Sequence, residues 1–171
     1  TQLAGLTITP PANADTDFNL TVTATATEAN PTSTDTTVTT LSVSAGAGTI
    51  AVDVIPQNDV SVIAGTSAGQ AGTDKTTVNP FSAASITDVD VPADSITVTV
   101  TLDTAAKGTL TGAGFTETGP DTGVYTFTGT ATAATTALQG LTFDPTENRV
   151  APGLTETTTF TLSVNEGSGP I

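Results

Sequence analysis

Apolar and polar side chains alternate with a period of two residues along much of this chain. In residues 20–27, Leu, Val and Ala alternate with Thr, and in residues 96–102 Ile, Val and Leu alternate with Thr. Successive side chains of an extended strand point to opposite faces, so each segment presents one apolar face and one hydroxyl face. Thr suits the outer face, because its branched Cβ favours extended backbone and its hydroxyl is polar without charge. Both segments are therefore predicted to be half-buried strands.

Shorter alternating segments lie between clusters of Gly, Pro, Asn and Asp, which favour turns. They predict further strands at residues 41–43, 52–54, 124–127, 141–143 and 160–164. Many short strands joined by turns are typical of an antiparallel β-sandwich, so an all-β fold is expected. The Phe residues and Tyr125 lie in or beside alternating segments and are expected in the core. A helix of a turn or two is expected only within residues 131–138, and the glycine-rich residues 46–48 and 112–114 are expected to form turns.

An internal repeat relates the start of the chain to its last third. Residues 3–13 align without a gap on residues 138–148, with six of eleven identical at an offset of 135. After a gap, residues 18–22 match residues 160–164 at an offset of 142. The first fifty or so residues therefore correspond to the closing part of a module.

The module boundary is placed where a strand ends at Pro56 and polar turn residues follow. We expect residues 1–56 to be the C-terminal part of a preceding β-sandwich module and residues 57–171 to be a complete module. The first part contains too few strands to close a sandwich. We therefore expect it to be completed by strands from another copy or by the preceding stretch of one fibre; addition of its strands to the second module's sheets is the alternative.

Composition narrows the possible chemistry. The 171 residues include 17 acidic and three basic side chains, a net charge of −14, so binding to nucleic acid phosphates is not expected. The chain contains no His, Cys, Met or Trp, which removes the usual proton shuttle, thiol nucleophile and sugar-stacking platform, and no enzymatic activity is expected. Lys75, Lys107 and Arg149 are far apart and are expected only to aid surface solubility. No apolar run approaches the roughly 20 residues of a membrane helix, so no membrane insertion is expected.

Four stretches in sequence order resemble the cadherin-like and immunoglobulin-like tandem modules of very large bacterial surface proteins, many of them adhesins exported by type I secretion. They are Asn79-Pro80-Phe81, Ile86-Thr87-Asp88-Val89-Asp90, residues 122–129 and residues 138–152. The resemblance covers residues 57–171 and, through the repeat, the start of the chain. It implies antiparallel Greek-key β-sandwiches in tandem, an extracellular or cell-surface location, and Ca²⁺ held at module junctions.

Candidate metal ligands lie just before the strand predicted at residues 96–102. Alternate residues of an extended segment point the same way, so Asp88 and Asp90, with Asp94 four residues on, can aim carboxylates at one hard cation such as Ca²⁺. The alternative is a solvated turn, since Asp is a common turn residue.

The family resemblance implies further ligands from the linker, which reads Pro56-Gln57-Asn58-Asp59 in place of the fuller Asp-x-Asn-Asp-Asn of cadherins. Asn58 and Asp59 are therefore added to the expected Ca²⁺ site, with Asp53 or Asp103 as additional candidates. Asp15 and Asp17, which also alternate, are interpreted as an exposed loop. Four residues near the far end are expected to bind metal only together with a following module: Asp144, Glu147, Asn165 and Glu166.

The function expected is mechanical: a structural repeat that spaces and stiffens an extended surface adhesin or biofilm fibre. Its partners are neighbouring modules of the same or an identical chain, and any host or surface ligand is bound through other domains. The alternative is a self-assembling extracellular filament subunit that a neighbouring copy completes by strand addition. A ligand-binding tip domain would need an exposed aromatic or cationic patch, which the sequence does not offer.

Overall fold

The computed structural model describes residues 5–28, 41–90, 93–112 and 114–167. The chain divides into two compact units, unit 1 at residues 1–56 and unit 2 at residues 57–171. This division coincides with the module boundary placed from the sequence, whereas the identity of each unit as a module stays a prediction. Each unit is described by itself.

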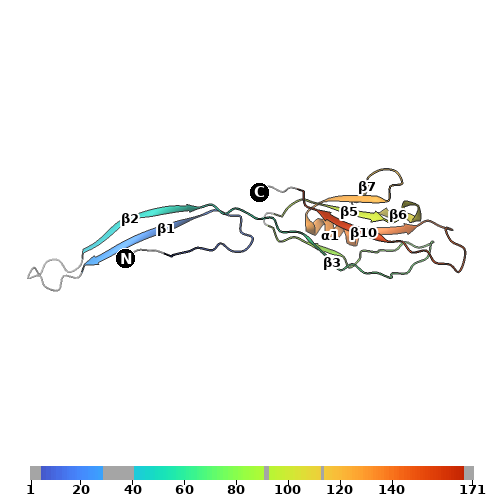
Figure 1. The fold of residues 1–171 in the computed structure, drawn as a ribbon, viewed down its shortest axis with the longest axis horizontal. Helices are drawn as coiled ribbons and strands as arrows, with labels where there is room; N and C mark the ends of the chain where they lie inside the picture. The colour runs from blue at the N-terminus through green and yellow to red at the C-terminus, as the bar shows by residue number, and fades with distance from the viewer. Residues whose placement is uncertain (1–4, 29–40, 91–92, 113, 168–171) are drawn as a thin grey trace, which may run out of the picture. The chain divides into compact units, whose positions relative to one another are not determined.

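Unit 1 contains a long antiparallel hairpin of β1 (Phe18–Glu28) and β2 (Leu41–Val52), drawn in blue and cyan in Figure 1. Phe18 pairs with Val52 and Leu20 with Ile50, and the register shifts once between Val22 and Ala24. The hairpin forms a two-stranded sheet of its own.

Two expectations for this hairpin are wrong in detail. The separate strands expected at residues 41–43 and 52–54 are replaced by one strand that ends at Val52. The expected turn at residues 46–48 lies inside that strand, with Gly48 opposite Val22. Glycine is permitted in an extended strand, and here pairing with β1 overrides its preference for turns.

The largest sheet of unit 2 has the strand order β10-β5-β8-β7, and all its neighbouring strands are antiparallel. The strands are β10 (Phe160–Asn165), β5 (Ile96–Leu102), β8 (Val124–Gly129) and β7 (Thr116–Glu117). Buried and half-buried residues alternate strictly along β5, which confirms its predicted strand and its inward apolar face. Thr97 and Thr128 approach each other across the opposite face, with 3.2 Å between their hydroxyl oxygens.

Two smaller sheets complete the strands of unit 2. In one, β3 (Val62–Ala64) pairs with β4 (Ser85–Thr87), and in the other β6 (Gly108–Thr111) pairs with β9 (Thr142–Pro145). A bridge adds Val78 to Phe143 of β9, through reciprocal backbone hydrogen bonds of 2.8 and 2.7 Å. A short 3₁₀ turn, η1 (Ala105–Lys107), leads from β5 into β6.

The helix α1 (Ala131–Gln139) forms where one was expected. Thr130 caps its N-terminus by accepting a hydrogen bond from the Ala133 N–H at 3.3 Å. The helix is tied to β4 by Thr135, whose hydroxyl accepts from the Ile86 N–H at 2.8 Å and donates to the Ile86 carbonyl at 3.1 Å. Small residues on one face let the helix approach the core closely; the buried ones are Ala131, Ala134, Ala137 and Leu138.

The core of unit 2 joins these elements around the inner face of β5. Phe81, Tyr125 and Phe143 are buried in it, as expected, and the Phe160 ring makes edge contacts with Phe81 and Phe143 at centroid distances of 5.5 and 5.1 Å. The mainly-β fold is confirmed, while the Greek-key sandwich stays a prediction. Within the described residues, no helix is long and apolar enough to cross a membrane.

Candidate functional site

The predicted acidic cluster lies between β4 and β5 and contacts the first residues of unit 2. The Asp90 N–H donates to Asp88 Oδ1 at 3.2 Å, a local turn that brings the Asp88 carboxylate to the Asp90 backbone. Both carboxylate oxygens of Asp90 accept from the Asp59 N–H, at 3.0 and 3.2 Å. Asp88 and Asp90 are half-buried and Asp59 is exposed. The structure therefore brings Asp59, Asp88 and Asp90 together.

Glu166, just after β10, joins the same first residues of unit 2. Its carboxylate accepts from Asn58 Nδ2 at 3.1 Å and from the Ser61 N–H. These hydrogen bonds, with Ser61 contributing most and Asn58 next, lower the pKa of Glu166 below the ordinary range of a glutamate. Glu166 thus fastens residues 58–61 to the end of β10.

The sequence reasoning assigned Glu166 only to a metal site shared with a following module. Its observed partners lie more than a hundred positions earlier in the chain. The signal in the sequence was the turn-rich composition of residues 165–170, which is similar to that of the boundary at residues 55–59.

Asp94 and Asp103 lie at opposite ends of β5. Asp94, half-buried, precedes the strand by two residues, whereas Asp103 follows it directly, more than about 20 Å away at the usual rise per residue. Asp103 accepts from Lys107 Nζ at 2.7 Å, and this hydrogen bond is the main cause that lowers the pKa of its carboxyl group. Asp103 is therefore not brought to Asp88 and Asp90.

Lys107 and Arg149, near the end of β5 that Asp103 follows, make structural contacts and do not only aid solubility as expected. Lys107 Nζ also donates to the Thr157 carbonyl at 2.6 Å. Arg149 donates to both carboxylate oxygens of Glu156, at 2.8 and 3.1 Å, and to the Ala106 carbonyl at 2.9 Å. Both side chains thus tie the loop between β9 and β10 to η1. The earlier interpretation missed these contacts because the partners are distant in sequence.

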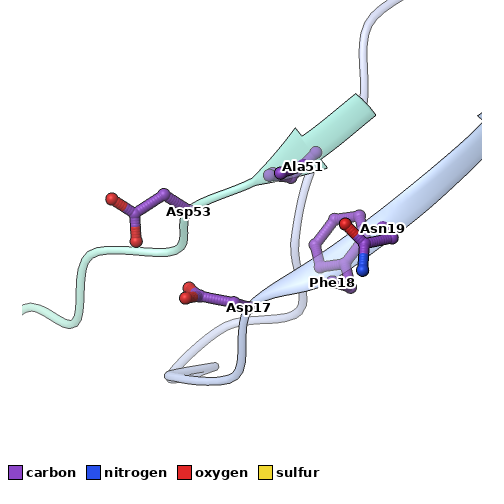
Figure 2. A pocket seen from close by; sticks show the side chains of 6 residues that line it. Asp17, Phe18, Asn19, Ala51 and Asp53 are labelled. Atoms are coloured by element: carbon purple, nitrogen blue, oxygen red, sulfur yellow. The ribbon is translucent and has the colours of Figure 1, made fainter. Parts of the chain in front are cut away.

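A second acidic pair lies at the end of the hairpin in unit 1, around a shallow hollow shown in Figure 2. Asp17 directly precedes Phe18 and Asp53 directly follows Val52, so both acidic residues lie just beyond the last residue pair of the hairpin. The Asp17 carboxylate accepts a hydrogen bond from the Val54 N–H at 2.9 Å. Six residues line the hollow: Asp17, Phe18, Asn19, Ala51, Val52 and Asp53. Asp17 therefore closes the end of the hairpin, a role that its interpretation as a loop residue missed.

The acidic side chains at the Asp88 and Asp90 end of unit 2 are of the kind that Ca²⁺ binds, because this hard cation takes oxygen ligands. They do not form a complete cage: in the part of the chain that the structure describes, no three acidic side chains converge closely enough to hold a metal ion. The carboxylates of Asp90 and Glu166 accept hydrogen bonds from N–H groups. The arrangement described is thus a hydrogen-bonded fastening of the start of unit 2.

No family model, characterised protein or solved structure matches this chain. The resemblance to cadherin-like and immunoglobulin-like modules therefore stays a prediction.

Proposed function

We propose that this protein is a non-catalytic structural repeat of an extended extracellular or cell-surface protein, in which it spaces and stiffens a long filament. The internal repeat carries the proposal, because two copies of one segment in a chain are typical of tandem arrays. The backbone supports their equivalence: Asn13 and Asn148, which align, both have a φ of 58°. That left-handed conformation is uncommon outside glycine, and Asn adopts it more readily than most residues.

A spacer module must carry the chain from one of its ends to the other. In unit 1, β1 leads away from Phe18, and β2 returns to Val52 beside it. Phe18 aligns with Phe160, which pairs with Leu102 at the end of β5 remote from Asp88. In the described residues, the chain enters unit 2 and leaves β10 at the same end, where Asn58 contacts Glu166. Successive modules add length if β10 is followed by a returning strand, as β1 is followed by β2.

Ca²⁺ is proposed to stiffen this spacer by binding at the Asp88 and Asp90 end of unit 2. Asn58, Asp59 and Glu166 take part in the contacts at this end, and each carries a further side-chain oxygen that can serve as a ligand. A net charge of −14 also favours cation binding over anion binding. A cation bound there restrains residues 58 and 59, which directly follow the boundary of unit 1.

Thermal unfolding in millimolar Ca²⁺ and in chelator tests the cation. We expect Ca²⁺ to raise the melting temperature by about 5–10 °C, because a ligand that binds only the folded state stabilises it by mass action. Replacing Asp88 and Asp90 together by Asn should remove most of the rise, while the control Asp121→Asn, at an exposed aspartate outside every candidate site, should keep it. Equal melting temperatures with Ca²⁺ and chelator in the unsubstituted chain would rule out a structural cation.

The second candidate function is a self-assembling filament subunit, favoured by exposed apolar side chains of unit 1 that include Leu6 and Ile50. Sedimentation over a hundredfold range of concentration separates the two candidates. A spacer repeat remains monomeric across the range. A filament subunit forms larger species as the concentration rises.

A further inference from the structure

The hairpin of unit 1 has one apolar and one polar face. Leu20 lies opposite Ile50 and Phe18 opposite Val52, so these side chains share a face with Val22. The other face carries Asn19, Thr21 and Thr49, among others. Val22 and Ile50 remain about half exposed, at 45% and 54%. Phe18, Leu20 and Val52 are half-buried, so the apolar face is open to solvent in part, around Val22 and Ile50.

The equivalent residues of unit 2 are covered. Leu6 is 81% exposed, whereas its counterpart Leu141 is completely buried. Ile8 is 49% exposed, and its counterpart Phe143 is 6% exposed. The same local sequence is therefore a core segment in one unit and a surface segment in the other.

The covering element in unit 2 is β5. It pairs with β10, the counterpart of β1, in the order Phe160–Leu102, Leu162–Val100 and Val164–Val98. Leu141 and Phe143 belong to the same core cluster as the buried side chains of β5. Among the described residues of unit 1, β1 pairs only with β2, so one edge of β1 has no strand partner there. Its counterpart β10 gives one edge to β5.

We propose that this edge of β1, with the apolar face formed by Phe18, Leu20, Val22, Ile50 and Val52, receives a β5-like strand supplied by a module of the same kind. The incoming strand lies antiparallel to β1, with the counterpart of Val100 opposite Leu20 and the counterpart of Val98 opposite Val22. Its alternating apolar residues cover the exposed face, while its Thr residues extend the polar face. The strand is uncharged, so pairing does not add to the charge repulsion of an acidic chain. The resulting sheet places β1 between β2 and the incoming strand.

The test adds a second copy of β5 ahead of the chain. Residues 57–137, which contain β5 but neither β9 nor β10, are fused ahead of residue 3. The chain has no cysteine, so Leu6→Cys introduces a unique thiol whose alkylation rate reports exposure. We expect the fused segment to slow alkylation by more than about tenfold. Leu154→Cys, at an exposed position outside the repeat match, should react equally fast in both chains.

A matched extension in which the added copy carries Val98→Asp and Val100→Asp should leave the Leu6→Cys thiol as reactive as in the unextended chain. Amide exchange of β1 provides a second measurement and should slow only with the unmodified extension. Fast alkylation and unprotected β1 amides in the extended chain would overturn the proposal. Protection in the unextended chain that is lost on dilution would also overturn it, by identifying a second copy as the occupant. Neither result would change the response of unit 2 to Ca²⁺, so failure here is distinguishable from failure of the spacer role.

Discussion

Exchanging Val and Thr between the two faces of β5 tests whether the alternation of this strand determines the core. Val100 is completely buried between Leu162 and Tyr125, its neighbours on the adjacent strands. Thr99, the residue before it, is half-buried on the opposite face. The variants Val100→Thr and Thr99→Val exchange a methyl group for a hydroxyl group at nearly constant volume.

The two variants are expected to change the free energy of unfolding by different amounts, because position 100 is completely buried and position 99 is half-buried. The described part of unit 2 has no buried polar residue, so the new hydroxyl at position 100 lacks a side-chain partner in the core. Loss of one buried methyl group costs about 0.8 kcal/mol, and an unpaired hydroxyl adds about 1–3 kcal/mol, so we expect Val100→Thr to lower the free energy of unfolding by about 2–3 kcal/mol. Thr99→Val should change it by less than about 0.5 kcal/mol.

Urea unfolding followed by tyrosine fluorescence measures both variants. Tyr125 is the only Tyr, there is no Trp, and the Tyr125 side chain is buried in unit 2, so the signal reports this unit alone. With a slope of about 1–1.5 kcal/mol per molar urea, Val100→Thr should lower the midpoint by about 2 M. Equal shifts for the two variants, or a larger shift for Thr99→Val, would refute the assignment of the inner face.

Three further predictions use the same unfolding assay. Glu166→Gln should lower the free energy of unfolding by about 1 kcal/mol at pH 7. Because the pKa of Glu166 is lowered in the folded state, its stabilisation is present above the ordinary carboxyl range and is lost as the pH falls through the lowered pKa. The difference in the free energy of unfolding between variant and unsubstituted chain should therefore shrink below about pH 4. Thr135→Val removes the hydroxyl bonded to both backbone groups of the buried Ile86 and should cost about 2–3 kcal/mol, whereas an unchanged midpoint would mean that these bonds contribute no stability. Gly65→Ala should cost at least about 2 kcal/mol, because φ is +70° and the added Cβ would meet the Ala83 carbonyl oxygen; a smaller loss would show that this turn relaxes easily.

The strands β1, β5, β8 and β10 and the helix were predictable from the sequence because their periodicity is local, whereas the longest strand, β2, was not. The seven residues 96–102 show four apolar positions on one face, and β5 has the same bounds. Strands of two to four residues, such as β3 and β7, are too short to show an alternation. The strand β7 pairs with the longer β8, and β3 pairs with the equally short β4, so both depend on partners elsewhere in the chain that no local pattern indicates.

The candidate site was predictable only in part, for the same physical reason. Asp88 and Asp90 share a turn, so their proximity follows from spacing. The contacts of Asn58 with Glu166 and of Asp17 with Val54 depend on which chain segments meet in the folded state. Gly48 shows the converse: the glycine-rich composition around it favours a turn, and its pairing with Val22 of β1 holds it in a strand.

Single-molecule stretching of the chain tests the proposed spacer role most directly. Unit 2 should resist load and unfold in one step, because its first strands and β10 meet in one core and Glu166 fastens its first residues to the end of β10. Its 115 residues, from 57 to 171, have an extended length of about 400 Å at 3.3–3.6 Å per residue, so the step should approach that value less the folded length. Ca²⁺ should raise the unfolding force, and the Asp88→Asn and Asp90→Asn double variant should lose that rise. Extension in several small steps at low force, with the same trace in Ca²⁺ and in chelator, would contradict a load-bearing repeat.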